Sequence, residues 1–346
     1  MTKSDPLSNY LPRVQKYLKE YQWNREFSPD WRKFRVKPLA QGEYNLNYLL
    51  CSPARSFVFR VNMGTQIDRD DQILYEYKTL LLLSRSGVTP QPYHVDDSRQ
   101  LIDRGILIME YLPGSPLDYR QDLSGAATAF AAIHGVEVRG EKNHLIVEEK
   151  PLSLIFAECS RLLEHYFSSE LAQPEITAYL RKLLAKLADQ KAKESYFQKD
   201  PWFAIVNTEV NSGNFIVNRK KGTTHLVDWE MPRWGDPSSD LCHFLSPLTT
   251  LWKTNYRFSH EAAGFFIRSY KDRIGPREQL NTLEDRLALK FPFVYLRGIS
   301  WSAMGWVAYQ KDYQGIRNRD TWRKLQQYMD LEFIASLFDP YLNNEL

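Results

Sequence analysis

The chain has 346 residues and a mass of 40.7 kDa, which is long enough for two lobes or two domains. Its 43% hydrophobic and 25% charged residues are typical of a globular protein, and a net charge of +3 without a stripe of Lys and Arg argues against a nucleic-acid partner. No run approaches the roughly 18 apolar residues of a membrane span, and the first ten residues lack the apolar core of a signal peptide. Cys51, Cys159 and Cys242 are scattered, which favours a reducing setting. We therefore expect a cytoplasmic protein with neither a membrane nor a nucleic-acid partner.

The N-terminal part alternates between helical and strand-like segments. Helical spacing of apolar residues predicts a helix over about 7–21. Segments 34–40 and 47–51 read as two strands, and Gln41 and Gly42 begin the turn between them. A glycine turn of this kind can cover a phosphate chain, although an ordinary hairpin is the more frequent meaning of a single glycine.

A third strand and the following helix carry one residue each of opposite charge. Arg60 lies within the apolar strand 56–61, and Glu76 stands near the start of the Leu-rich helical run 75–85. A cation on a strand and a Glu on the next helix form the ion pair that orients nucleotide phosphates in kinases. The alternative is that the two are independent surface residues.

The composition changes near residue 110. The strand 105–111 is apolar on both faces and therefore predicted to be buried, and a Leu-Pro-Gly turn ends it. Beyond it, the helical segments are 126–134, 152–168 and 174–195. His134 can be read as a catalytic base, but a packed core histidine is the more frequent case.

The stretch from Asn207 to Asp240 stands apart from the rest. A polar loop leads into a short strand, a basic turn and a second short strand that ends at Asp228. An acid and an amide in the loop, with a carboxylate at the strand end, are ligands that magnesium accepts together with substrate phosphates. The residues alone therefore predict a metal–phosphate site.

The same stretch resembles the catalytic segment of the aminoglycoside phosphotransferase and choline kinase-like family. That family has His-Gly-Asp-x-x-x-x-Asn, a hairpin, and then Ile-Asp-Trp/Phe-Glu. Here Asn207-Thr208-Glu209 stands in place of His-Gly-Asp, Asn214 matches the Asn, and Val227 to Glu230 match the second motif. Gly235-Asp236-Pro237 with Asp240 matches the continuation Gly-Asp-Pro-x-x-Asp.

The resemblance implies an α+β, two-lobed protein kinase-like fold, with a small antiparallel-sheet lobe over 1–110 and a mainly helical lobe over 111–346. It also implies an enzyme that uses ATP and magnesium to phosphorylate a hydroxyl of a small-molecule acceptor. Asp228 and Asn214 would hold the metal ion, and Glu209 would accept the hydroxyl proton.

The resemblance assigns the nucleotide contacts as well. Arg60, fixed by Glu76, would contact the phosphates, and Gln41 and Gly42 would cover them with backbone N–H groups. The adenine would bind backbone groups near Glu110 and Leu112, at the hinge between the lobes. Asp240 would hold the backbone of the catalytic loop.

Three readings of the catalytic loop remain open. Glu is one methylene longer than Asp, and a displacement of about 1 Å can cost about a hundredfold in rate. The chain is thus a kinase whose loop fits the longer side chain, a slow enzyme, or a nucleotide-binding pseudokinase. Histidine-based metalloenzymes and Gly-x-Ser-x-Gly hydrolases are excluded by the absence of those patterns.

The remainder of the chain is predicted to be helical, with Pro247, Pro276 and Pro292 separating the helices. Trp301 and Trp306 either pack between these helices, which is the more frequent case, or line an acceptor pocket.

Overall fold

The computed structural model describes residues 6–21, 33–42, 44–138, 143–311 and 319–343. The chain divides into two compact units. Unit 1 consists of residues 1–146 and 214–232, and unit 2 of residues 147–213 and 233–346. The fold class is α+β, with a small antiparallel sheet in one lobe and a mainly helical second lobe. The boundary expected near residue 110 stays a prediction.

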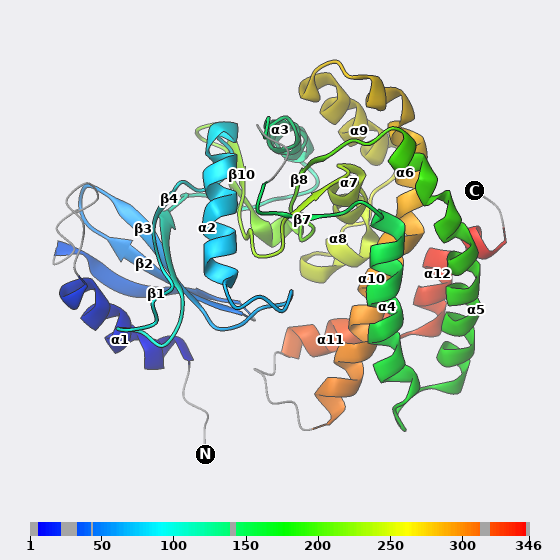
Figure 1. The fold of residues 1–346 in the computed structure, drawn as a ribbon, viewed down its shortest axis with the longest axis horizontal. Helices are drawn as coiled ribbons and strands as arrows, with labels where there is room; N and C mark the ends of the chain where they lie inside the picture. The colour runs from blue at the N-terminus through cyan, green and yellow to red at the C-terminus, as the bar shows by residue number, and fades with distance from the viewer. Residues whose placement is uncertain (1–5, 22–32, 43, 139–142, 312–318, 344–346) are drawn as a thin grey trace. The chain divides into compact units, whose positions relative to one another are not determined.

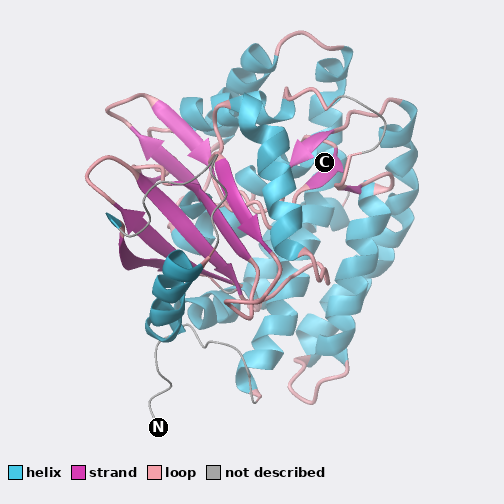
Figure 2. Cartoon of the chain, turned by 60° about the vertical axis from the view of Figure 1, so that its left-hand side comes forward, coloured by secondary structure: helices cyan, strands magenta, loops and turns pink. Residues whose placement is uncertain are grey.

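The main sheet of unit 1 is antiparallel and has the order β1-β2-β3-β5-β4. Figure 2 shows its strands in magenta. Its strands are β1 (Arg35–Gln41), β2 (Asn45–Cys51), β3 (Ser56–Asn62), β4 (Pro92–Asp96) and β5 (Ile106–Glu110). The apolar sequences of β3 and β5 make them the inner, buried strands, whereas β1 is exposed along its length and forms an edge. In this register Arg60 lies opposite Asn47 on β2 and Leu107 on β5.

Two helices accompany this sheet (Figure 1). Helix α1 (Pro6–Glu20) buries Val14, Tyr17 and Leu18 at helical spacing, and the Tyr17 hydroxyl donates to Asp96 on β4 at 2.9 Å. Helix α2 (Gln72–Leu83) follows β3 and includes Glu76 among its buried residues.

A second, three-stranded sheet of unit 1 has the order β10-β9-β6. It joins β6 (Ser115–Pro116) to the hairpin of β9 (Phe215–Asn218) and β10 (Thr223–Leu226). Helix α3 (Leu123–His134) packs on β10, where a Cβ at Gly125 would come within 2.4 Å of Thr224, so that only glycine permits this close approach. His134 is buried and stacks on Phe130 with 5.7 Å between ring centroids, as expected of a core histidine.

Unit 2 is built mainly of helices (Figure 1). In chain order these are α4 (Pro151–Phe167), α5 (Pro174–Gln190), α6 (Ser195–Lys199), α7 (Ser238–Leu245), α8 (Pro247–Lys253), α9 (His260–Ile274), α10 (Leu283–Gln310), α11 (Arg319–Tyr328) and α12 (Leu331–Leu342). A small sheet has the order β7-β11-β8, with β7 (Ile146–Val147), β8 (Ala204–Val206) and β11 (Arg233–Gly235), and the loop that begins at Asn207 follows β8 directly.

The long helix α10 organises this unit and corrects one expectation. Pro292 does not separate two helices but lies inside α10, which runs unbroken from Leu283 to Gln310. A proline in a helix interior costs about 3 kcal/mol. The helix tolerates it because α10 packs along both α4 and α7, and this tertiary burial outweighs the local preference.

The two tryptophans of α10 pack between helices, in agreement with the simpler of the two readings. Trp301 meets Trp252 of α8 edge-on at 5.5 Å between centroids, and Trp306 meets Tyr166 of α4 at 6.2 Å. Across the described residues, no helix carries an apolar stretch long enough to cross a membrane.

Candidate active site

The Arg60 guanidinium is the centre of a charged cluster in unit 1. Its Nη1 donates to Glu76 at 2.5 Å and to Asp228 at 3.0 Å, and its Nε donates to Asn47 at 3.0 Å. Only 7% of the Arg60 side chain is exposed. The structure thus joins a strand, a helix and the end of the β9–β10 hairpin through one buried side chain.

Three carboxylates face this single cation, because Glu230 also approaches Arg60 Nη1, at 3.9 Å. Burial alone would lower the pKa of Arg60, but the charges of Glu76, Asp228 and Glu230 outweigh it and raise that pKa above its ordinary value. Burial likewise raises the pKa of Glu76, and the adjacent guanidinium opposes that rise. A site with this excess of acidic groups favours a further cation.

The segment after Asp228 is fixed by contacts that the sequence did not indicate. Gln72 Nε2 donates to the carbonyl oxygen of Glu230 at 2.7 Å, and the Asn45 amide donates to the Glu230 carboxylate. Trp229 is fully buried and donates from Nε1 to the Leu226 carbonyl at 3.0 Å. Asn45 and Gln72 are buried polar residues next to apolar ones, which is the signal that could have identified them.

A backbone hydrogen bond at the base of the hairpin links Asn214 to the residue before Asp228. Asn214 ends a short 3₁₀ turn, Ser212–Asn214, and its carbonyl oxygen accepts from the Val227 N–H at 2.8 Å. Asp228 has a left-handed backbone with φ of 67°. Of its side chain 29% is exposed, so the carboxylate is accessible although it contacts Arg60. An acid held in this uncommon conformation is a feature typical of functional sites.

The turn between β1 and β2 contains Gln41 and Gly42, both exposed. The Gly42 N–H donates to the Asn45 carbonyl at 2.9 Å. A Cβ at Gly42 would meet its nearest atom, the Asn45 oxygen, at 3.7 Å, which is ordinary contact. The protein itself therefore does not require glycine here.

At the end of β5, the two residues expected to contact adenine differ in whether their backbone groups are already hydrogen-bonded. The Glu110 N–H donates to Gln91 O at 2.8 Å, so this donor is already used within unit 1. Within the described residues, the N–H and C=O of Leu112 form no hydrogen bond. No hydrogen bond or ion pair of the described residues joins Gln41, Gly42, Glu110 or Leu112 to Arg60.

Glu209 lies in unit 2, in a loop that one aspartate organises. The Asp240 carboxylate accepts from the Asn207 N–H at 2.8 and 3.0 Å and from the Thr208 N–H at 2.8 Å. The Glu209 N–H donates to Asn207 Oδ1 at 3.0 Å, forming a local turn. Asp240 thus has the loop-holding role that the resemblance implied.

Thr208 has φ of 68°, a left-handed conformation that β-branched residues rarely adopt. This position corresponds to the glycine of the family pattern. The loop keeps the backbone path that a glycine would take, although it has lost the glycine.

A second aspartate anchors the start of α7. Asp236 caps Ser238 with a 2.9 Å hydrogen bond to its N–H, and its other oxygen accepts from Arg286 at 2.5 Å. Arg286 is fully buried and also donates to the Asp200 carbonyl at 2.5 Å. These bonds fix the turn from which α7 presents Asp240 to the catalytic loop.

The described residues contain no group of three or more His, Cys, Asp or Glu side chains arranged to hold a metal ion. The donor set at the hairpin, one accessible Asp228 carboxylate and one Asn214 amide, suits a hard cation that takes its remaining ligands from phosphates.

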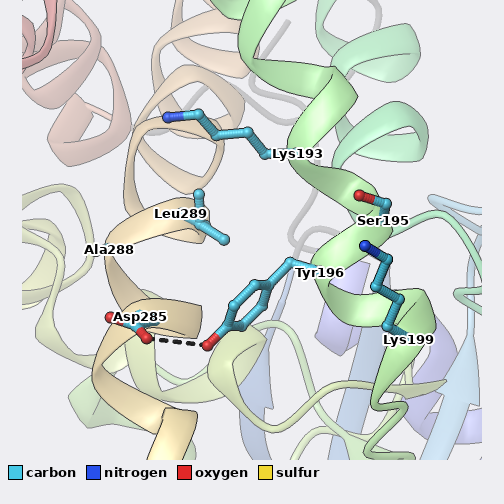
Figure 3. A pocket seen from close by; sticks show the side chains of 7 residues that line it. All are labelled: Lys193, Ser195, Tyr196, Lys199, Asp285, Ala288 and Leu289. Carbon is cyan, nitrogen blue, oxygen red and sulfur yellow. Dashed lines mark hydrogen bonds between the residues drawn. The ribbon is translucent and has the colours of Figure 1, made fainter.

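A hollow of about 450 Å³ lies elsewhere in unit 2, between the α6 region and α10 (Figure 3). Its lining residues are Lys193, Ser195, Tyr196, Lys199, Asp285, Ala288 and Leu289. The Tyr196 hydroxyl donates to Asp285 across its floor at 3.0 Å. None of the expected site residues lines this hollow.

Comparisons with known proteins agree with this geometry. The phosphotransferase enzyme family (APH) matches residues 35–280. A Ralstonia eutropha protein assigned to the aminoglycoside phosphotransferases has a similar structure, with a TM-score of 0.65, 14% identity, and coverage of 96% of this chain and 98% of that one. The ethanolamine kinase of Plasmodium vivax superimposes with a TM-score of 0.62, 11% identity, and coverage of 100% and 97%.

Spectinomycin phosphotransferase, solved with ADP and spectinomycin, has a TM-score of 0.56, 12% identity, and coverage of 90% and 93%. These likenesses establish the fold, and a search of curated proteins found no significant match. Because the family match spans well over half of the sequence, the chain belongs to the phosphotransferase enzyme family.

Proposed function

We propose that this protein is an ATP- and magnesium-dependent kinase that transfers the γ-phosphoryl group to a hydroxyl of a small-molecule acceptor in the cytoplasm. The observation that carries the proposal is the buried Arg60 cluster, in which one guanidinium contacts Glu76 at 2.5 Å and Asp228 at 3.0 Å. Phosphoryl transfer depends chiefly on positioning and charge neutralisation, and this cluster provides both.

Asp228 and Asn214 are the residues that would hold magnesium. The ion, when bound, neutralises charge on the transferring phosphoryl group. The Val227–Asn214 backbone hydrogen bond keeps the two ligand-bearing residues at one end of the hairpin. Arg60, held rigid by Glu76 and Asn47, would contact the nonterminal phosphates.

The remaining nucleotide contacts follow the expected pattern. Gln41 and Gly42 would cover the phosphates with backbone N–H groups, and a Cβ at Gly42 would meet only ordinary contacts, at 3.7 and 3.9 Å. The Gly42 N–H would exchange its bond to the Asn45 carbonyl for one to a phosphate oxygen. The backbone groups of Leu112, which form no hydrogen bond within the described part of the chain, would bind the adenine edge, beside Glu110. We place the division between the two lobes at this hinge, near residue 110.

In the transfer step the acceptor hydroxyl oxygen forms a bond to the γ-phosphorus, and the bond from that phosphorus to the β–γ bridging oxygen breaks, releasing ADP. Glu209 accepts the proton of the hydroxyl. Asp240 contributes by fixing the backbone of Asn207 and Thr208, which sets where the Glu209 side chain begins.

A thermal-shift titration with ATP and magnesium tests the nucleotide site. Ligand is expected to stabilise the wild type, and much less the Asp228→Ala variant, because the variant loses a metal ligand. Equal stabilisation of both proteins would exclude Asp228 from the site, and no stabilisation of either would contradict the nucleotide proposal.

The second candidate is a pseudokinase that binds nucleotide without transferring phosphate, and the replacements at Asn207, Thr208 and Glu209 favour it. An acceptor-panel assay of ADP release, comparing the wild type with Glu209→Gln, separates the two. The kinase predicts acceptor-dependent turnover that falls at least about a hundredfold in the variant. Nucleotide binding without turnover on any acceptor would support the pseudokinase.

A further inference from the structure

Helix α10 carries two cations on one buried face. Lys290 is fully buried and Arg297 has 19% of its side chain exposed. They are seven residues apart, which places them on the same side of a helix. Each has one carboxylate nearby: Glu148 Oε2 is 3.9 Å from Lys290 Nζ, and Glu158 Oε1 on α4 is 3.5 Å from Arg297 Nε.

Several polar side-chain atoms on or beside this face have no hydrogen-bond partner among the described residues. Among the described residues, no group accepts a hydrogen bond from either Nη atom of Arg297, whose single hydrogen bond is the one from Nε. Lys290 Nζ and His243 Nδ1, on the neighbouring α7, are buried and have no hydrogen-bond partner among the described residues either. Buried polar atoms such as Lys290 Nζ and His243 Nδ1 are normally satisfied by a polar ligand or by water, and the partly exposed Arg297 is accessible to such a ligand.

This face lies within electrostatic reach of the catalytic loop. Burial alone would lower the pKa of Arg297, but the charges of Glu158 and then Glu209 outweigh it and raise that pKa. The charge of Arg297 in turn acts on His243, one turn after the loop-holding Asp240. Helix α7, which carries the loop-holding Asp240, packs along α10, so the loop of Glu209 and Arg297 lie in one region of unit 2. The ion pair of Arg297 is to Glu158.

We propose that the phosphoryl acceptor carries an anionic group, a carboxylate or a phosphate, which the Nη atoms of Arg297 bind while the acceptor hydroxyl is presented to Glu209. The planar guanidinium suits two parallel hydrogen bonds to such an oxyanion. With Nε engaged by Glu158, the hydrogen-bonding capacity of both Nη atoms is left for the ligand. This inference rests on the proposed kinase function and names its substrate class.

The test measures binding of acetate and of inorganic phosphate by thermal shift, with the nucleotide site first saturated by ADP. The proteins are the wild type, Arg297→Met, Arg297→Lys, and Arg161→Met as a matched control, because Arg161 is an exposed arginine of α4. We expect one anion or both to stabilise the wild type and the control. Arg297→Met should bind at least about tenfold more weakly, and Arg297→Lys should fall between them because it keeps the charge without the fork.

Glu158→Gln is a second variant, and it is expected to fold as the wild type does because 40% of the Glu158 side chain is exposed. It should bind the anion more tightly than the wild type, because a neighbouring negative charge is removed. The proposal is overturned if neither anion stabilises the wild type, or if Arg297→Met binds them equally well.

Turnover with matched acceptors completes the test. Glycerate, glycerol 3-phosphate and glycerol offer a hydroxyl with a carboxylate, with a phosphate and with neither. Arg297→Met should raise KM for the anionic acceptors and leave the ADP-induced thermal shift unchanged. A fall in kcat alone for all acceptors would instead make Arg297 a positioning residue for Glu209. Loss of nucleotide binding by the wild type would defeat the kinase proposal and leave anion binding at Arg297 standing.

Discussion

At the scale of single residues, Thr208 is the most unusual member of the catalytic loop. Its φ of 68° is accessible to glycine at little cost, whereas for other residues the left-handed region costs about 1–2 kcal/mol. Asp240 stabilises this conformation because its carboxylate accepts hydrogen bonds from the N–H groups of Asn207 and Thr208. One buried carboxylate thus keeps Thr208 in a strained backbone conformation.

Replacing Thr208 by glycine should relieve this strain. Part of the gain is offset by the greater freedom of glycine in the unfolded chain, so the net stabilisation should be up to about 1 kcal/mol. Thr208→Val keeps the β-branched shape and should give no gain. Urea denaturation of the three proteins measures the difference, and a loss of stability in Thr208→Gly with none in Thr208→Val would show that the conformation is not strained.

Asp240→Asn should weaken the loop. The variant keeps one acceptor oxygen but loses the charge that serves two N–H donors, at a cost of about 1.5–3 kcal/mol in unfolding free energy. Movement of the loop by about 1 Å would also lower kcat by about a hundredfold. ATP-induced thermal shifts should be retained, because Asp240 lies in unit 2, whereas Arg60 and Asp228 lie in unit 1. Unchanged kcat in Asp240→Asn would remove it from the loop-positioning role.

At the scale of elements, the β1–β2 hairpin and helix α10 show what can and cannot be predicted from the local sequence. The strands flanking Gly42 were predicted from alternation alone, and the structure has them with shifts of a few residues. Pro292 was wrongly expected to end a helix, because packing of α10 on α4 and α7 is not a local property of the sequence.

Arg297 was missed for a different reason. It is the only charged residue between Phe291 and Gln310, and such an isolated charge in an apolar helix indicates a partner or a ligand. The prediction for this segment was based on its aromatic residues instead. The cluster of Arg60, Glu76 and Asp228 was anticipated through the family resemblance, since a spacing of 168 residues between Arg60 and Asp228 gives no local signal.

The Gly42→Ala variant separates a structural glycine from one needed by a ligand. A Cβ would meet only backbone atoms of Asn45, the oxygen at 3.7 Å and the nitrogen at 3.9 Å, so the unfolding free energy should change by less than about 0.5 kcal/mol. If the turn covers phosphates, the added methyl should weaken ATP binding several-fold. The measurement is the ATP titration beside a urea melt, and unchanged ATP affinity would exclude close contact of this turn with the nucleotide.

At the scale of the whole molecule, buried histidines make stability depend on pH. Burial lowers the pKa of His243 to about 3, with the charge of Arg297 acting in the same direction. Between that value and its ordinary pKa of about 6.5, the unfolded chain binds a proton that the folded chain does not. Stability is therefore fully present above pH 6.5 and is lost as pH falls towards 3.

This linkage predicts a loss of about 2 kcal/mol from His243 between pH 7 and pH 5. Burial also lowers the pKa values of His94, His144 and His225, which adds to the slope. His243→Leu should flatten the decrease in urea midpoint between the two pH values, whereas the exposed His260→Leu serves as a control that retains it. Equal slopes in His243→Leu and the wild type would show that His243 is not held neutral.

The division of the chain has a consequence for the order in which it folds. Unit 1 is built from two separate stretches, and its second stretch, 214–232, follows the first part of unit 2. During synthesis the main sheet is therefore complete long before Asp228 leaves the ribosome, and Arg60 must wait for two of its three carboxylate partners, Asp228 and Glu230. A fragment ending at residue 146 would contain the sheet and Glu76 without the β9–β10 hairpin. The Arg60 cluster is thus completed late in synthesis, and any fragment truncated from its C-terminal end that keeps the cluster also keeps residues 147–213 of unit 2.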